Sequence, residues 1–141
     1  MDDPQYAQEM TEVMAVELTD LGIQQLKTTK EVDKFMKDSK GSLLLIVNSV
    51  CGCAASGARP AMKIAMNNKK LPDKIATVFA GVDLEATEKA RSYIKNYEAS
   101  SPSFALFKKG KQVFMLERKD LVYKSPEEIS KQLTNAFEKF C

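Results

Sequence analysis

Apolar and polar residues follow one another along this chain in patterns that predict both helices and strands. Apolar residues recur at helical spacing in five segments, which cover residues 4–21, 29–40, 54–66, 84–94 and 126–140. Continuous or alternating apolar runs predict five strands, at 23–26, 42–48, 75–82, 103–107 and 112–116. The first of these strands has only Ile23 and Leu26 as apolar residues, so we expect it at the edge of a sheet.

Capping and turn residues mark the boundaries of these segments. Helix starts are expected at Asp3–Pro4, at the capping box of Thr28 with Glu31, at the Asp83 side chain, and at Ser125–Pro126 with Glu128. Gly22 and Gly41 suit helix ends. Between the last two strands, residues 108–111 contain Gly110 and predict the turn of a β-hairpin.

The order of the elements predicts an α/β fold. Residues 43–47 are aliphatic throughout, which is typical of a strand covered on both faces. Alternating strands and helices give a parallel core through right-handed crossovers, and the closing hairpin adds antiparallel strands. We therefore expect a three-layer α/β/α sandwich with a mixed central sheet and an extra N-terminal helix within residues 1–22. No repeat or linker divides the chain, so residues 1–141 are expected to form one domain.

Composition and charge narrow the range of functions. The chain has 141 residues, of which 44% are hydrophobic and 28% charged, as in ordinary globular proteins. The net charge is only +2, and this balance argues against a nucleic-acid partner. The aliphatic run at 43–47 is too short to span a membrane, and no signal peptide is visible at the N-terminus. We therefore expect neither a membrane protein nor a secreted one.

The absence of histidine removes many kinds of catalysis. With 0 histidines the chain cannot build a Ser-His-Asp or Cys-His pair, nor a histidine-ligated metal site. Three cysteines remain, Cys51, Cys53 and Cys141, and an odd number does not indicate a structural disulfide framework. Special chemistry is therefore expected from thiols, carboxylates, lysines or the backbone.

The Cys51-Gly52-Cys53 segment lies where a predicted buried strand ends and a helix begins. Unpaired backbone amides at a helix start stabilise a thiolate, which is the attacking species in disulfide exchange. Gly52 allows a tight bend, and a one-residue spacer closes a small ring, so a disulfide here is expected to be strained and easily reduced. Two other interpretations are small apolar residues at a packed strand end, and a metal site completed by Cys141 or a second subunit.

The order of elements resembles that of thioredoxin-like domains, and Ser101-Pro102 precedes the fourth predicted strand. In such domains a cis-proline at this strand start lies beside the reactive cysteines, and its neighbouring backbone pairs with an extended substrate. The resemblance therefore predicts a cis bond at Pro102, although an ordinary trans loop proline is the commoner case for an isolated proline. Pro60 resembles the proline that kinks the active-site helix of thioredoxins; alternatively it ends a short first helical segment.

Two further residues are expected to have no part in the chemistry. Arg59 could add positive potential near the thiolate, but we expect it to be a solvated helix residue. Cys141 follows the last helix at a terminus expected to fray. Its alternatives are an exposed, incidental thiol and a disulfide between two copies of the chain in a homodimer.

Five segments together resemble the bacilliredoxin family. They are VNSVCGCAA at 47–55, ARPA at 58–61, VFAG at 78–81, SSPS at 100–103 and FEKFC at 137–141. The resemblance spans nearly the whole chain, and it implies a cytoplasmic enzyme that strips bacillithiol from mixed disulfides on other proteins. Cys51 would attack the mixed disulfide and take the bacillithiol, and Cys53 would resolve or tune the product.

The same resemblance implies the remaining features of the site. Gly52, Ser101 and Pro102 would bind the substrate, no cofactor or metal would be held, and bacillithiol would be the thiol co-substrate. The partners would be S-thiolated cytoplasmic proteins and a low-molecular-weight thiol. Two alternatives stay open: a general protein disulfide reductase or isomerase, and a non-enzymatic thioredoxin-fold module that binds metal through its thiols.

One departure from thioredoxins concerns proton transfer. Thioredoxins usually bury a carboxylate in the strand before the cysteines, whereas residues 43–47 here are aliphatic and Asn48 cannot titrate. General acid-base catalysis is therefore expected only from water or a distant carboxylate. We accordingly do not expect dithiol turnover as fast as that of thioredoxins.

Overall fold

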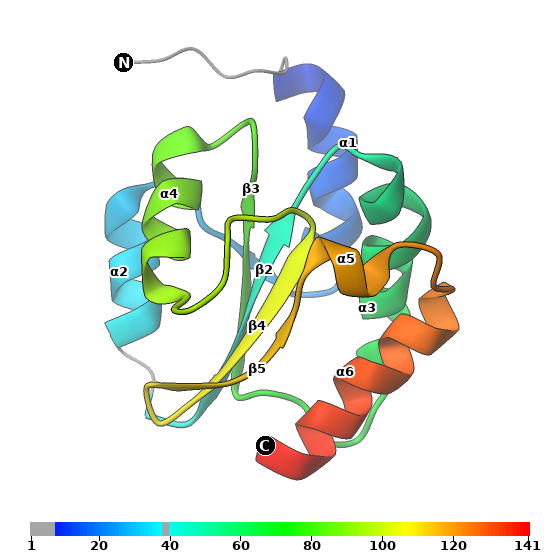
Figure 1. Cartoon of the computed structure of the whole chain (residues 1–141). Helices are drawn as coiled ribbons and strands as arrows, with labels where there is room; N and C mark the ends of the chain where they lie inside the picture. The colour runs from blue at the N-terminus through cyan, green and yellow to red at the C-terminus, as the bar shows by residue number, and fades with distance from the viewer. Residues whose placement is uncertain (1–7, 38–39) are drawn as a thin grey trace.

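A mixed sheet lies at the centre of the molecule (Figure 1). The computed structural model describes residues 8–37 and 40–141, so the expected helix start at Asp3–Pro4 lies outside the described residues. The strands are β1 (Gln24–Gln25), β2 (Ser42–Asn48), β3 (Lys74–Phe79), β4 (Ser103–Lys108) and β5 (Lys111–Leu116). Their order is β1-β3-β2-β4-β5, with β1, β3 and β2 parallel and β4 and β5 each antiparallel to the strand before it in that order.

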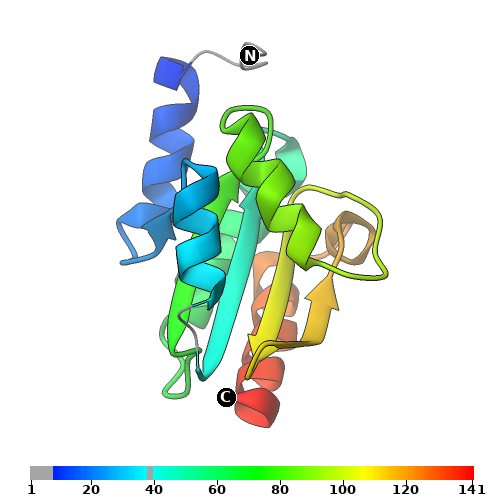
Figure 2. The same ribbon diagram turned by 90° about the vertical axis from the view of Figure 1, so that its left-hand side faces the viewer.

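Helices cover both faces of the sheet (Figures 1 and 2). On one face lie α2 (Thr29–Lys37) and α4 (Leu84–Tyr93); on the other lie α1 (Gln8–Thr19), α3 (Arg59–Ala65) and α6 (Pro126–Phe140). A π-helical turn, η1 (Ala54–Ala58), precedes α3, and a short helix, α5 (Arg118–Leu121), follows β5. The expected three-layer sandwich with an additional N-terminal helix is confirmed.

Strand β2 is buried along its whole length, as its aliphatic sequence predicts. Leu43, Leu45 and Val47 pack in the core beneath α2 and α4. Leu44 and Ile46 point the other way, into the core beneath α3 and α6. Because successive side chains of a strand alternate between faces, a central strand needs apolar residues at every position.

Both predicted capping boxes are present. The backbone N–H of Glu31 donates to Oγ1 of Thr28 at 3.1 Å, and the N–H of Thr28 donates back to the Glu31 carboxylate at 3.1 Å. At α6 the N–H of Glu128 donates to Oγ of Ser125 at 3.1 Å, with the return bond at 3.0 Å. These bonds satisfy amide groups that have no partner inside the helix.

The predicted hairpin joins β4 to β5 through two residues in the left-handed region. Lys109 has a φ of 51° and Gly110 a φ of 79°. Positive φ at both central positions matches the type of turn whose twist suits a two-residue hairpin. The register shifts once, between Leu106 and Phe107.

Three features differ from the sequence prediction. The strand expected to reach Val82 ends at Phe79, because the chain turns at Gly81, which has a φ of 85°. Helix α1 buries Leu18, but its apolar residues Met10 and Val13 are 65% and 73% exposed. Helix α5 has only 4 residues, too few to produce a periodic apolar pattern.

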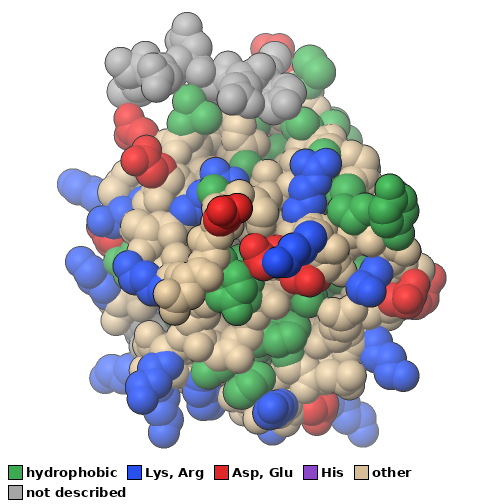
Figure 3. All heavy atoms as spheres, viewed as in Figure 1, with side chains coloured by type: hydrophobic (Ala, Val, Ile, Leu, Met, Phe, Trp, Pro, Cys, Tyr) green, Lys and Arg blue, Asp and Glu red, His purple; other side chains and the backbone are tan. Residues whose placement is uncertain are grey.

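On the molecular surface, acidic and basic side chains are interspersed across the face seen in Figure 3. This distribution agrees with the small net charge of +2. Among the helices of the described residues, none has the length and apolar character needed to cross a membrane.

Candidate active site

The loop after β2 places the cysteine pair at the start of a helix. The backbone N–H groups of Ala54 and Ala55 both donate to the carbonyl oxygen of Cys51, at 3.1 Å each. The first turn, η1, is π-helical, and α3 continues it from Arg59. Cys51 and Cys53 are free thiols, and each is partly exposed. The predicted position at a strand end and helix start is confirmed.

Hydrogen bonds at this helix start favour the thiolate of Cys51. Partial burial acts to raise the pKa of Cys51, because it disfavours the charged form. Hydrogen bonds from the Ser49 hydroxyl and the Ala54 backbone outweigh that effect, helped by the positive charge of Arg118 and the backbone of Cys53. The pKa of Cys51 therefore lies below its ordinary value. A lowered thiol pKa raises the fraction of nucleophile at neutral pH.

Ser49 contacts Cys51 and is itself held in place. Its Oγ accepts a hydrogen bond from the Cys51 backbone N–H at 3.2 Å. Its own backbone N–H donates to Oδ1 of Asn48 at 2.8 Å, and its carbonyl accepts from Nη1 of Arg59 at 2.7 Å. Ser49 and Asn48 are both buried, so these bonds are shielded from water.

Arg59 is the largest correction to the sequence prediction. It is 3% exposed rather than solvated. Its Nη1 also donates to Oδ1 of Asn48 at 3.1 Å, and its Nε donates to the Glu17 carboxylate at 2.8 Å. The buried positive charge of Arg59 is tolerated because a carboxylate pairs with it and carbonyl oxygens accept hydrogen bonds from its N–H groups. Glu17 lies 42 positions earlier in the chain, so no local pattern could have identified the pair.

Pro102 lies at the same end of the sheet as this network. The Ser101–Pro102 peptide bond is cis, as expected. Pro102 is buried and lies close to Asn48 and Arg59. The β4 residue that follows it, Ser103, pairs with Val47 of β2, which fixes the proline beside the strand that leads to Cys51.

The two other residues predicted near the site are also placed. At Gly52 an added Cβ would meet nothing within 4 Å, so the space over this residue is open. Pro60 lies in the first turn of α3, at the junction with the π-helical turn. The helical pattern continues through Pro60 to Ala65, so the proline does not end a helical segment and lies inside the active-site helix, as the resemblance to thioredoxins predicts.

Cys141 lies far from this loop. It follows α6 at the end of the sheet opposite the Cys51 loop (Figure 1). Like Cys51 and Cys53 it is partly exposed, and it packs with Phe140 against the core under α6. Its N–H donates to the carbonyl of Phe137 at 2.9 Å, which continues the helical pattern to the last residue.

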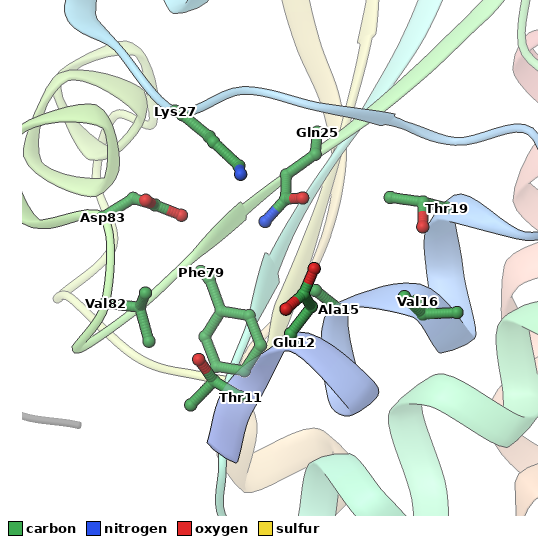
Figure 4. Close-up of a pocket in the computed structure, with 10 residues that line it drawn as sticks. All are labelled: Thr11, Glu12, Ala15, Val16, Thr19, Gln25, Lys27, Phe79, Val82 and Asp83. Atoms are coloured by element: carbon green, nitrogen blue, oxygen red, sulfur yellow. The ribbon is translucent and has the colours of Figure 1, made fainter. Parts of the chain in front are cut away.

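Asp83 is a second correction. It precedes α4 at the N-cap position, but its side chain makes no capping hydrogen bond, and Oδ2 is buried without a partner. The carboxylate borders a cavity of about 190 Å³ that Lys27 and Gln25 also line (Figure 4). Burial raises the pKa of Asp83, although the charge of Lys27 opposes the shift. No cysteine lines this cavity, so Asp83 is not placed to exchange a proton with the thiols.

Comparisons with known proteins agree with this arrangement. A family model described as disulphide isomerase matches residues 6–141. A bacilliredoxin of Salinibacter ruber is 46% identical over 138 residues, which cover 96% of this chain and 81% of that protein. A bacilliredoxin of Bacillus licheniformis is 45% identical over 138 residues, covering 97% of this chain and 96% of that protein. The chain belongs to the bacilliredoxin family.

Solved structures that share the fold of this chain include thioredoxins. Fasciola hepatica thioredoxin superposes with a TM-score of 0.57 at 17% identity, covering 84% of this chain and 100% of the thioredoxin. A Schistosoma mansoni thioredoxin pre-protein gives a TM-score of 0.58 at 16% identity, with 84% and 98% covered. The thioredoxin-like fold expected from the sequence is thus confirmed. Family and fold together support thiol-disulfide oxidoreductase chemistry in this bacilliredoxin.

A metal centre was one of the alternatives for the thiols. Within residues 8–37 and 40–141 there is no group of three or more Cys, Asp or Glu side chains that could hold a metal ion.

Proposed function

We propose that this bacilliredoxin removes bacillithiol, or a similar low-molecular-weight thiol, from mixed disulfides on cytoplasmic proteins. The observation that carries the proposal is Cys51, a partly exposed thiol at a helix start whose pKa is lowered by the hydrogen bonds around it. Such a thiol is a nucleophile in disulfide exchange.

The first step is an exchange without net oxidation. The Cys51 thiolate attacks the small-thiol sulfur of the mixed disulfide, a new disulfide forms between Cys51 and the small thiol, and the protein thiolate leaves. The number of disulfides is unchanged, so no oxidant is consumed. A second thiol that attacks the Cys51 sulfur releases the small thiol and becomes disulfide-bonded to Cys51, and a further thiol must then reduce that disulfide to restore the Cys51 thiol.

Cys53 is one source of that second thiol. Its attack on the Cys51 mixed disulfide would free the small thiol and leave a Cys51–Cys53 disulfide for an external thiol to reduce. A one-residue spacer makes this ring small, and strand β2, which leads to the cysteines, carries no carboxylate. Both points favour a route in which Cys51 alone performs the first step.

The protein part of the substrate is assigned to the edge formed by Gly52, Ser101 and Pro102. The space over Gly52 is open, and Ser101 lines the same groove as Ser49 and Val50, which directly precede Cys51. An extended peptide could pair with the backbone of Ser101 while its mixed disulfide reaches Cys51.

A dethiolation assay tests the proposal. One model protein carries bacillithiol, glutathione or coenzyme A as a mixed disulfide, and release of each thiol is followed side by side. We expect release with at least one of the three, retained in Cys53→Ala for a single turnover and absent in Cys51→Ala. A lack of release from all three substrates would overturn the proposed function.

A further inference from the structure

A groove of about 660 Å³ runs between α4 and the segment that leads to Pro102. Ser49 and Val50, which directly precede Cys51, form one part of its lining, and Ser101 forms another. Helix α4 contributes Glu88 and Arg91. The groove therefore borders both the predicted nucleophile and the cis-proline, and its volume is typical of sites for small molecules.

Arg91 lines this groove and also an adjacent cavity of about 240 Å³, and most of its hydrogen-bond donors have no partner in the described structure. Its Nη2 donates to the carbonyl of Ser100 at 3.4 Å, the long limit of a hydrogen bond. Its Nε is buried and has no hydrogen-bond partner in the described structure. Among the described residues, no carboxylate forms an ion pair with Arg91.

An unpaired, partly buried guanidinium is unusual, because burial without a partner costs free energy. Burial lowers the pKa of Arg91, yet an arginine side chain stays protonated in proteins. A carboxylate that entered the groove could accept two parallel hydrogen bonds from it. The side chain thus meets the chemical requirement for binding an anion.

Glu88 lies one helical turn before Arg91 and lines the same groove. Among the described residues it forms no ion pair, so the groove presents one charge of each sign. A small thiol derived from an amino acid carries a carboxylate and an ammonium group, which complement these two charges. The Cys51 loop at the groove's edge lies where the sulfur of such a thiol would have to be.

We propose that this groove holds the small-thiol half of the mixed disulfide, with Arg91 binding its carboxylate. The assignment rests on the proposed function and adds a chemical class to it: a low-molecular-weight thiol with a carboxylate. Arg91 is then a residue that sets specificity for the small thiol, while the protein half lies outside the groove.

Binding can be measured without any turnover. S-methylglutathione is an unreactive thioether that carries carboxylates and an ammonium group. In an NMR titration of the wild-type protein, we expect it to shift the backbone signals of Val50, Thr87 and Ser101. Arg91→Gln should weaken this binding about tenfold, which corresponds to about 1.4 kcal/mol, and Arg91→Lys should restore part of it.

Lys89→Gln is the matched control for this charge change. Lys89 lies on the same helix, is 37% exposed and pairs with Asp33 outside the groove. Lys89→Gln removes one positive charge, as Arg91→Gln does, so a long-range effect of net charge on binding would appear equally in both variants. We expect binding of S-methylglutathione to Lys89→Gln within about twofold of wild type.

Turnover provides the second readout. The ratio of kcat/KM for a glutathione mixed disulfide to that for a 2-mercaptoethanol mixed disulfide should fall about tenfold in Arg91→Gln. If S-methylglutathione binds in the groove but no mixed disulfide is dethiolated, the proposed function is overturned. The assignment of the groove as a site for small thiols then still stands. The groove assignment is overturned if S-methylglutathione does not shift groove signals, or if Arg91→Gln changes neither its binding nor the substrate ratio.

Discussion

The guanidinium of Arg59 donates a 2.7 Å hydrogen bond to the carbonyl oxygen of Ser49, two residues before Cys51. The same side chain pairs with Glu17 of α1 at 2.8 Å. The N-terminal helix is thereby connected to the loop that carries the predicted nucleophile. The extra helix of this fold has a structural role at the site, because it supplies the charge that allows Arg59 to be buried.

Replacing Arg59 tests this connection. Arg59→Ala leaves the buried acceptors of Asn48 and Ser49 without their donor, and we expect the free energy of unfolding to fall by about 3 kcal/mol. Glu17→Gln should cost less, about 1 kcal/mol, because a glutamine can still accept the hydrogen bond from Nε and the Glu17 side chain is 46% exposed. Urea denaturation measures both. Equal losses in the two variants would contradict the account.

Ser49 is predicted to set the reactivity of Cys51. Ser49→Ala removes the hydroxyl that stabilises the thiolate, so the pKa of Cys51 should rise. Loss of one hydrogen bond worth about 1 kcal/mol should slow alkylation by iodoacetamide roughly fivefold near neutral pH. The difference should disappear at a pH high enough to ionise the thiol fully.

Ser56→Ala is the matched control for that variant. The Ser56 hydroxyl donates to the carbonyl of Gly52 at 2.7 Å, within the same turn but not to the sulfur of Cys51. Alkylation of Cys51 in Ser56→Ala should match wild type. If Ser56→Ala slows the reaction as much as Ser49→Ala, the effect is one of loop structure.

Asp83 should make stability depend on pH. Its pKa is raised in the folded state by burial, so the folded protein favours the neutral form. The contribution of Asp83 to the free energy of unfolding is therefore present at low pH and is lost as the pH rises through the folded-state pKa. Asp83→Asn should therefore raise Tm at pH 7 and leave it nearly unchanged at pH values below the ordinary pKa of an aspartate.

Asp20→Asn removes the same charge at an exposed position and serves as the control. Tm of both variants is measured by thermal unfolding at acidic and neutral pH. A stabilisation in Asp83→Asn that is equal at the two pH values would show that the ionisation of Asp83 is not its cause.

Cys141 is predicted to be dispensable for the chemistry. It lies at the opposite end of the sheet from Cys51 (Figure 1). Cys141→Ser should keep dethiolation turnover within about twofold of wild type, with at most a small loss of stability since the thiol is partly buried. A large loss of turnover would identify Cys141 as a resolving cysteine.

The sequence predicted those parts of the fold that depend on neighbouring residues. Strand β2 was predictable because a central strand must be apolar on both faces, and residues 43–47 are. The capping boxes and the Gly110 turn depend on residues three or fewer positions apart. The helix start at Cys51 followed from the end of that strand.

The parts that could not be predicted depend on contacts between distant segments. An arginine is usually solvated, and Arg59 is buried only because Glu17 and Ser49 come to it from other elements. Asp83 has the residue type of a helix cap, but its carboxylate borders a cavity that α1 helps to form. The groove at Arg91 arises from the packing of α4 beside residues 99–101, which no spacing in the sequence indicates.

The central claim, that Cys51 takes the small thiol from the protein, is tested most directly by locating that thiol after one turnover. Cys53→Ala enzyme is mixed with a bacillithiolated model protein, and intact-protein and peptide mass spectrometry follow. We predict bacillithiol on Cys51 and a fully reduced model protein. Bacillithiol on Cys141, or a stable disulfide between Cys51 and the model protein, would contradict the account.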